Sequence, residues 1–122
     1  MQRVAIEAAL AVTGRLGFHV RDAGLLESAL DRPVTRVFGE YAYPRLELAA
    51  AAQTESITRN HAMIDGNKRT ALVLMGAFLR VNGLRLQMDS DTAYDLIMSV
   101  AQGQRTLEDS GRLIGEHMRA WA

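Results

Sequence analysis

The 122-residue chain contains no cysteine and carries no net charge. Without cysteine it cannot form a disulfide scaffold, a thiolate zinc site or a thiol nucleophile. Because its 14 basic and 14 acidic residues balance, the composition gives no electrostatic indication of a nucleic-acid partner. The uncharged run at residues 70–79 is about half of the roughly 20 residues that a membrane-spanning helix requires. We therefore expect no direct contact with nucleic acid and no membrane span.

Lysine is almost absent as well, because 13 of the 14 basic residues are arginine. The exception, Lys68, lies in the stretch His61-Ala-Met-Ile-Asp-Gly-Asn-Lys-Arg69. A lysine ammonium is a compact point charge on a flexible stem, which suits a single phosphate oxygen better than the planar guanidinium group does. Five residues of this stretch can bind protons, metal or phosphate: His61, Asp65, Asn67, Lys68 and Arg69.

The remaining composition is that of a globular domain, with 48% hydrophobic and 23% charged residues. A chain of this length buries about two thirds of its unfolded surface, so we expect a single domain over residues 1–122. The sequence does not predict a secretory signal, which would combine a basic region with a long apolar run. Glu7 interrupts the apolar segment at residues 4–12. Together with the lack of cysteine, this is compatible with a cytoplasmic location, which we expect.

Hydrophobic periodicity predicts helices at about residues 2–15, 22–31, 45–60, 67–82, 92–102 and 107–121. Asp22, the Asp89-Ser90-Asp91 stretch and Thr106 are candidate N-caps, and Pro44 is expected at the first helical position of the third helix. Residues 33–44 are predicted to be either a simple loop or a short hairpin. Residues 84–88 are compatible with one short strand. Trp121 is expected to close the apolar face of the last helix.

The helix at residues 67–82 is apolar nearly all round, which predicts burial on every side. Gly76, midway along it, is expected to allow close approach by a neighbouring helix, and Gly83 is typical of a helix end. The predicted fold class is therefore all-α: a compact bundle of about six helices around a buried central helix, with at most a short β-hairpin.

The start of this central helix has the properties of an anion site. Asp65 or Asn67 is the candidate N-cap, and the unpaired N–H groups and dipole of a helix N-terminus attract anions. Lys68 and Arg69 in the first turn oppose the usual preference for acidic residues there. Cations at this end cost stability unless an anion neutralises them, so the pattern predicts a bound phosphate.

Residues 61–69 resemble the signature H-x-F-x-[DE]-[AG]-N-[GK]-R of the Fic/Doc family. Lys68 places the resemblance in the Doc branch, because the Fic branch carries glycine there. The similarity extends over roughly residues 20–90 and includes the segments 25–33, 38–44, 67–72 and 82–84. One residue departs from the signature: Met63 stands where the family has a buried phenylalanine, a gap that methionine can fill.

The resemblance assigns roles within the motif. His61 is the expected base, because a neutral imidazole can accept a hydroxyl proton near pH 7, although a lone histidine is more often structural or solvated. Asp65 is the expected Mg²⁺ ligand; its alternative role is the N-cap. Asn67, Lys68 and Arg69 are expected to bind phosphate, with Gly66 allowing a sharp turn and a close approach of the backbone.

The resemblance also implies a function. It predicts a toxin of a type II toxin–antitoxin pair that transfers the γ-phosphate of ATP to a Ser/Thr hydroxyl, with elongation factor Tu as target and a Phd-like antitoxin as partner. Leu72 supports this branch, since the Fic branch has a second arginine there that holds the nucleotide for AMP transfer. The family's flap, which holds a target peptide, corresponds to Phe38, Gly39, Glu40 and Tyr41. The alternatives are AMP transfer to a protein hydroxyl and a non-catalytic helical interaction module.

Overall fold

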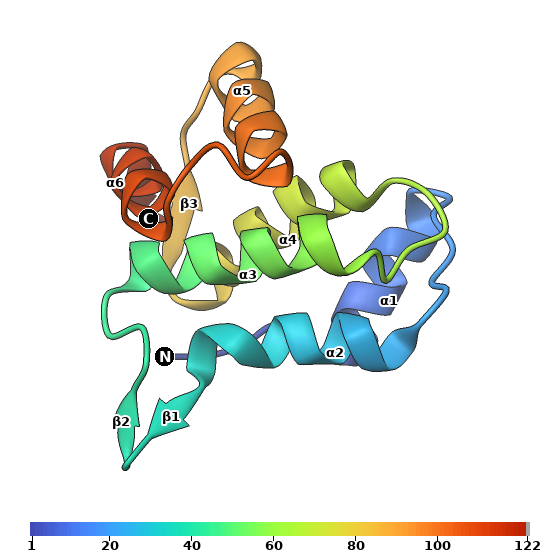
Figure 1. The fold of residues 1–122 in the computed structure, drawn as a ribbon, viewed down its shortest axis with the longest axis horizontal. Helices are drawn as coiled ribbons and strands as arrows, with labels where there is room; N and C mark the ends of the chain where they lie inside the picture. The colour runs from blue at the N-terminus through green and yellow to red at the C-terminus, as the bar shows by residue number, and fades with distance from the viewer. Residues whose placement is uncertain (122) are drawn as a thin grey trace.

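The computed structural model describes residues 1–121. Within this range it has six α-helices, a short 3₁₀ helix and four short strands (Figure 1). The helices are α1 (Ile6–Arg15), α2 (Ala23–Asp31), α3 (Leu46–Asn60), α4 (Asn67–Val81), α5 (Ser90–Ala101) and α6 (Leu107–Glu116). The 3₁₀ helix η1 (Arg32–Val34) follows α2 directly. The prediction of a bundle of about six helices is confirmed.

Two antiparallel helices, α3 and α4, form the centre of the bundle (Figure 1). The four consecutive alanines of α3, Ala49–Ala52, are all buried, and their small side chains let neighbouring helices approach closely. As a result α3 contacts α2, η1, α4, α5 and α6. Between the two central helices, the Gln53 side chain donates a hydrogen bond to the Leu74 carbonyl at 3.0 Å.

Burial of α4 is more one-sided than its sequence predicts. Its buried apolar residues are Ala71, Leu74, Met75, Phe78 and Leu79. Val81, by contrast, is 48% exposed, and Leu72 and Val73 are only partly buried. The expectation that α4 is buried on every side is therefore wrong. The helix that is surrounded by other elements is α3.

Side-chain caps start three helices as predicted. Asp22 accepts a hydrogen bond from the Leu25 N–H, Asp89 from Thr92 and Thr106 from Asp109. The pKa of the Asp89 carboxyl is lowered, mainly by the hydrogen bond from the Thr92 hydroxyl and next by the hydrogen bond from the Thr92 N–H. Pro44 does not take the predicted position, because α3 begins at Leu46 with Arg45 as its N-cap.

Two small antiparallel sheets complete the fold. Strands β1 (Arg36–Val37) and β2 (Glu40–Tyr41) form a hairpin, one of the two outcomes expected for residues 33–44. Strand β3 (Leu84–Leu86) pairs with β4 (Met118–Ala120), so α6 ends at Glu116 and not near residue 121. Leu84, Leu86 and Met118 pack against the core from this second sheet.

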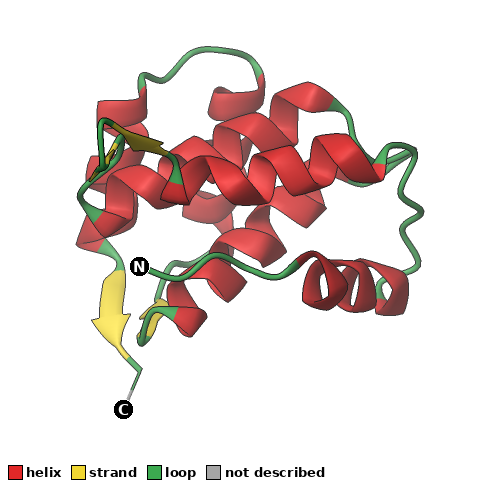
Figure 2. Ribbon diagram, turned by 90° about the horizontal axis from the view of Figure 1, so that it is seen from below, coloured by secondary structure: helices red, strands yellow, loops and turns green. Residues whose placement is uncertain are grey.

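Trp121 does not close the apolar face of α6. Its side chain is 51% exposed, and the Arg80 guanidinium lies over its ring, 4.5 Å from the centroid. Seen from below, the strands gather at the same end of the bundle, away from the loop that joins α3 to α4 (Figure 2).

Gly76 gives a first testable prediction. A Cβ atom added at Gly76 would meet nothing within 4 Å, so the expected close approach of another helix is wrong. We expect Gly76→Ala to stabilise the protein by up to about 1 kcal/mol, since glycine is a poor residue for a helix interior. Urea unfolding measures the change.

Gly83→Ala is the matched control. A Cβ there also meets nothing within 4 Å, but the backbone has φ +82°. This variant should lose about 1–2 kcal/mol, the cost of a left-handed conformation for a residue with a Cβ. A loss of stability in Gly76→Ala would contradict the open space beside that helix.

Candidate active site

The motif loop joins the C-terminus of α3 to the N-terminus of α4. It begins at His61, which caps α3 in a left-handed conformation with φ 53°, and ends at Gly66, the N-cap of α4, with φ 78°. Gly66 offers no side chain, and the N-terminus of α4 has no side-chain cap. The expectation that Asp65 or Asn67 is the N-cap is therefore wrong. The first N–H groups of α4 are left available to a ligand.

Asn67 fastens this loop to α4. Its Oδ1 accepts from the Met63 N–H at 3.0 Å, and its Nδ2 donates to the Met63 carbonyl at 3.2 Å. The Met63 side chain is 1% exposed, so methionine fills the buried position of the family's phenylalanine. Asn67 was expected to bind phosphate, but in the structure both functional groups of its amide hold the loop.

The connector between α1 and α2 supports the loop from the other side. Ala62 accepts hydrogen bonds from the Arg21 and Asp22 N–H groups at 2.8 and 3.0 Å, and the Ile64 N–H donates to the His19 carbonyl at 3.0 Å. Val20 forms a β-bridge with Met63. The Arg21 guanidinium also donates to the His61 carbonyl. The loop backbone is therefore held in place by residues about 40 positions earlier in the sequence.

Gly66 is required by its surroundings as well as by its backbone. A Cβ at this position would lie 2.6 Å from the Phe18 ring, and the positive φ already favours glycine. Phe18 is half-buried and packs over the turn. Phe18 was not predicted as part of the site, because nothing in the sequence around residues 17–20 connects it to the motif.

A cavity of about 390 Å³ opens at this loop. It is lined by the six residues predicted to act in catalysis, metal binding and phosphate binding (His61, Asp65, Gly66, Asn67, Lys68 and Arg69), together with Phe18, Thr58 and Ile64. The side chains of His61, Asp65, Lys68 and Arg69 are exposed, so solvent and ligands can reach them. An imidazole, a carboxylate, two cations and a helix N-terminus without a side-chain cap therefore share one opening.

The charges in the cavity suit a phosphate ligand with Mg²⁺. Asp65 is the one acidic residue of its lining, and its Oδ1 accepts from the Gly66 N–H at 2.8 Å. Among residues 1–121 no group of three or more histidine, aspartate or glutamate side chains could hold a metal ion. A single carboxylate fits Mg²⁺, because this ion takes its other ligands readily from phosphate oxygens and water.

The predicted flap does not lie beside the cavity. The hairpin β1–β2 lies at the N-terminal end of α3 and the motif loop at its C-terminal end (Figure 1). A helix of 15 residues separates them, about 22 Å at 1.5 Å per residue. Phe38, Gly39, Glu40 and Tyr41 are absent from the cavity lining. At the hairpin tip, Phe38 is fully exposed with φ 51°.

Comparison with known proteins identifies the family. The model of the Fic/DOC family matches residues 2–79, which run from the N-terminal segment through most of α4 and include the whole motif. The chain belongs to the Fic/DOC family. The resemblance found in the motif is therefore confirmed.

Within this family the chain is similar to Toxin Doc of Mycolicibacterium smegmatis (strain ATCC 700084 / mc(2)155). The two are 51% identical over 84 residues, which is 67% of this chain and 65% of the relative. The Fic/DOC chain thus spans less than two thirds of the relative that it matches.

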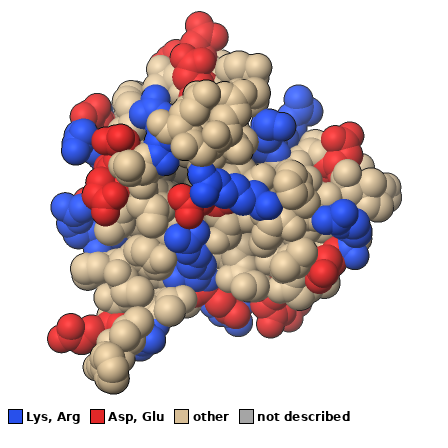
Figure 3. Space-filling view, in the orientation of Figure 1, with Lys and Arg blue, Asp and Glu red and all other residues tan. Residues whose placement is uncertain are grey.

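Two further observations describe the rest of the Fic/DOC chain. No helix in the described range is long and apolar enough to cross a membrane. On the face shown in Figure 3, basic and acidic side chains are interspersed over the surface.

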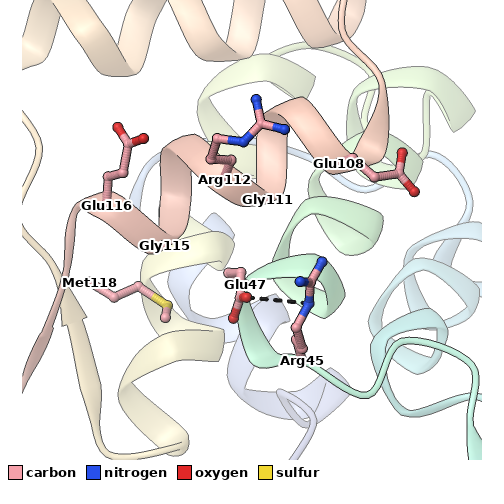
Figure 4. Close-up of a pocket in the computed structure, with 8 residues that line it drawn as sticks. All are labelled: Arg45, Glu47, Glu108, Gly111, Arg112, Gly115, Glu116 and Met118. Carbon is pink, nitrogen blue, oxygen red and sulfur yellow. Dashed lines mark ion pairs between the residues drawn. The ribbon is translucent and has the colours of Figure 1, made fainter.

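A separate hollow lies between the start of α3 and α6 (Figure 4). Arg45, Glu47, Glu108, Arg112 and Glu116 line it, with Arg45 and Glu47 paired at 3.5 Å. It contains no histidine or motif residue, so it is not part of the candidate active site.

Proposed function

We propose that this chain is the toxin of a type II toxin–antitoxin pair and phosphorylates a Ser/Thr hydroxyl of a target protein with ATP. Elongation factor Tu is the proposed target and a Phd-like protein the proposed antitoxin, which places the reaction in the cytoplasm. The observation that supports this most directly is the cavity at the start of α4. It brings His61, Asp65, Lys68 and Arg69 together around a helix N-terminus without a side-chain cap.

Each side chain of the cavity has its own role in the proposed reaction. His61 accepts the proton of the acceptor hydroxyl as that oxygen attacks the γ-phosphorus of ATP; the bond from this phosphorus to the β,γ-bridging oxygen breaks, and ADP leaves. Lys68, Arg69 and the first N–H groups of α4 bind the phosphate oxygens and stabilise the charge of the transition state. Asp65 would hold Mg²⁺, which neutralises phosphate charge when bound. Asn67 and Gly66 set the backbone that carries these groups.

Transfer of the γ-phosphate is favoured over AMP transfer by two residues. Lys68 occupies the position where the AMP-transferring branch has glycine, and Leu72 occupies the position of its second arginine. Leu72 lines an apolar hollow beside α5 and supplies no charge to a nucleotide. AMP transfer to a protein hydroxyl remains the alternative reaction.

Isotope labelling tests the reaction. Purified protein is incubated with elongation factor Tu and either γ- or α-labelled ATP, with His61→Gly as the inactive control. We expect label on the target from γ-labelled ATP alone. Label from α-labelled ATP alone would instead establish AMP transfer. No transfer of either label to this target would contradict the proposed activity on elongation factor Tu.

A further inference from the structure

The sheet formed by β3 and β4 has one face on the core and one face toward solvent. Leu84, Leu86 and Met118 pack against the core. Because side chains alternate between the two faces of a strand, the intervening residues Arg85 and Arg119 point to solvent, and both are exposed. We refer to this solvent-facing side as the outer sheet face. It lies at the end of the bundle away from the motif loop (Figure 2).

Two arginines lie directly opposite each other on the outer sheet face. Arg85 pairs with Arg119 in the register of β3 and β4, which places their Cβ atoms about 5 Å apart. Like charges in this arrangement destabilise a sheet. Within residues 1–121 neither guanidinium forms an ion pair with a carboxylate. The repulsion between them is therefore uncompensated, and an anion bound between the two groups would remove it.

An arginine–tryptophan pair extends the outer sheet face. The Trp121 N–H donates a hydrogen bond to the Gly83 carbonyl at 3.1 Å, so the pairing of the two chain segments continues beyond Ala120. Trp121 lies two positions after Arg119 and therefore on the same face. The Arg80 guanidinium over its ring adds a third cation. No aspartate or glutamate belongs to either strand, so this face combines cations with an aromatic ring.

We propose that the outer sheet face is a docking site for an acidic segment of a partner protein. Guanidinium groups bind carboxylates in a planar, bidentate manner, so Arg85 and Arg119 together suit an extended segment with several Asp or Glu residues. Trp121, which is 51% exposed, offers a flat surface against which the rest of the segment packs. The site is independent of the proposed phosphate transfer, because the 15 residues of α4 separate the motif loop from β3.

The charge of the chain favours a polypeptide over a nucleic acid on this face. Affinity for nucleic acid grows with the number of phosphates that are neutralised, and three cations contribute little at physiological salt. The chain as a whole carries no net charge, so it does not attract a polyanion from a distance. A short acidic segment requires only the local contacts that the arginines supply.

Trp121 reports binding directly, because it is the one tryptophan of the chain. The full chain would be titrated with a short glutamate-rich peptide while its tryptophan fluorescence is followed. We expect a saturable change that weakens as salt is raised, since exposed charges are screened. Arg85→Gln should bind the peptide about tenfold more weakly, the lower end of the contribution of a hydrogen bond to a charged group.

Thermal unfolding separates a binding role of Arg85 from a structural one. Without peptide, Arg85→Gln should melt at a slightly higher temperature than the unmodified chain, because one of two opposed charges is removed. Added peptide should raise the melting temperature of the unmodified chain more than that of the variant. A lower melting temperature of the variant together with weaker binding would show a structural role for Arg85 and would overturn the proposal.

Arg15→Gln is the matched control, because Arg15 is exposed in the last turn of α1 and the variant loses the same charge. It should bind the peptide like the unmodified chain. Equal weakening in both variants would show a general effect of charge, and unchanged fluorescence on addition of peptide would show no binding at this face; either result contradicts the proposal. Tighter binding of a single-stranded oligonucleotide of equal charge would assign the face to nucleic acid and would overturn it as well.

Discussion

Replacing His61 with glycine is expected to lower the rate of phosphate transfer by about 10²–10⁴-fold, the usual contribution of a general base. Stability should change by less than about 1 kcal/mol, as for other exposed positions. The backbone at His61 has φ 53°, and glycine adopts this conformation without strain. Glycine is therefore a better test than alanine, because it removes the imidazole and keeps the helix end.

Rate assays with labelled ATP and thermal unfolding measure the two effects separately. His19→Ala is a suitable control, since His19 is exposed but does not line the cavity. It should retain activity. A His61→Gly variant that is clearly less stable and still active would show that His61 has a packing role and would contradict the catalytic assignment.

Asp65→Asn is expected to reduce the rate by at least about tenfold, equivalent to about 1.4 kcal/mol of transition-state stabilisation. Asparagine keeps an oxygen for the Gly66 N–H but loses the charge that would bind Mg²⁺. The variant should also be less stable in the absence of nucleotide, by about 0.3–1 kcal/mol. Lys68 and Arg69 then lie at the positive end of α4 without a nearby anion.

Sulfate provides the decisive measurement for Asp65→Asn. An added anion can take the place of the lost charge at the helix N-terminus, so thermal melts in sulfate should recover part of the stability but none of the activity. In the same sulfate series, the His61→Gly variant should gain no more stability than the unmodified chain gains. If sulfate stabilises neither variant nor the unmodified chain, the start of α4 is not an anion site.

The sequence predicts the helices well because each carries its own local signal. Apolar periodicity marks α2, α3 and α5, and Asp22, Asp89 and Thr106 cap helices as expected. The end of α6 could not be predicted in this way. Residues 118–120 pair with Leu84–Leu86, more than 30 positions away, and a local pattern does not contain that partner.

The candidate site, too, could be predicted from the sequence only in part. Residues 61–69 are contiguous, so their chemistry and their position before a helix could be predicted from the sequence alone. Three properties depend on the folded geometry and could not: the packing of Phe18 against Gly66, the two local hydrogen bonds of Asn67 to Met63, and the distance of the β1–β2 hairpin from His61. Asn67 shows the limit most clearly, because an amide suited to phosphate is equally suited to a backbone.

The motif loop depends on the connector before α2 for part of its support. Residues 19–22 hold the motif loop through hydrogen bonds to the backbone of Ala62 and Ile64 and through the β-bridge between Val20 and Met63. None of these contacts involves a side chain of the proposed chemistry. Drawing this connector away from the loop would remove the support beneath His61 while leaving every reactive group intact. A site disturbed in this way would lose its geometry without any ligand in the cavity.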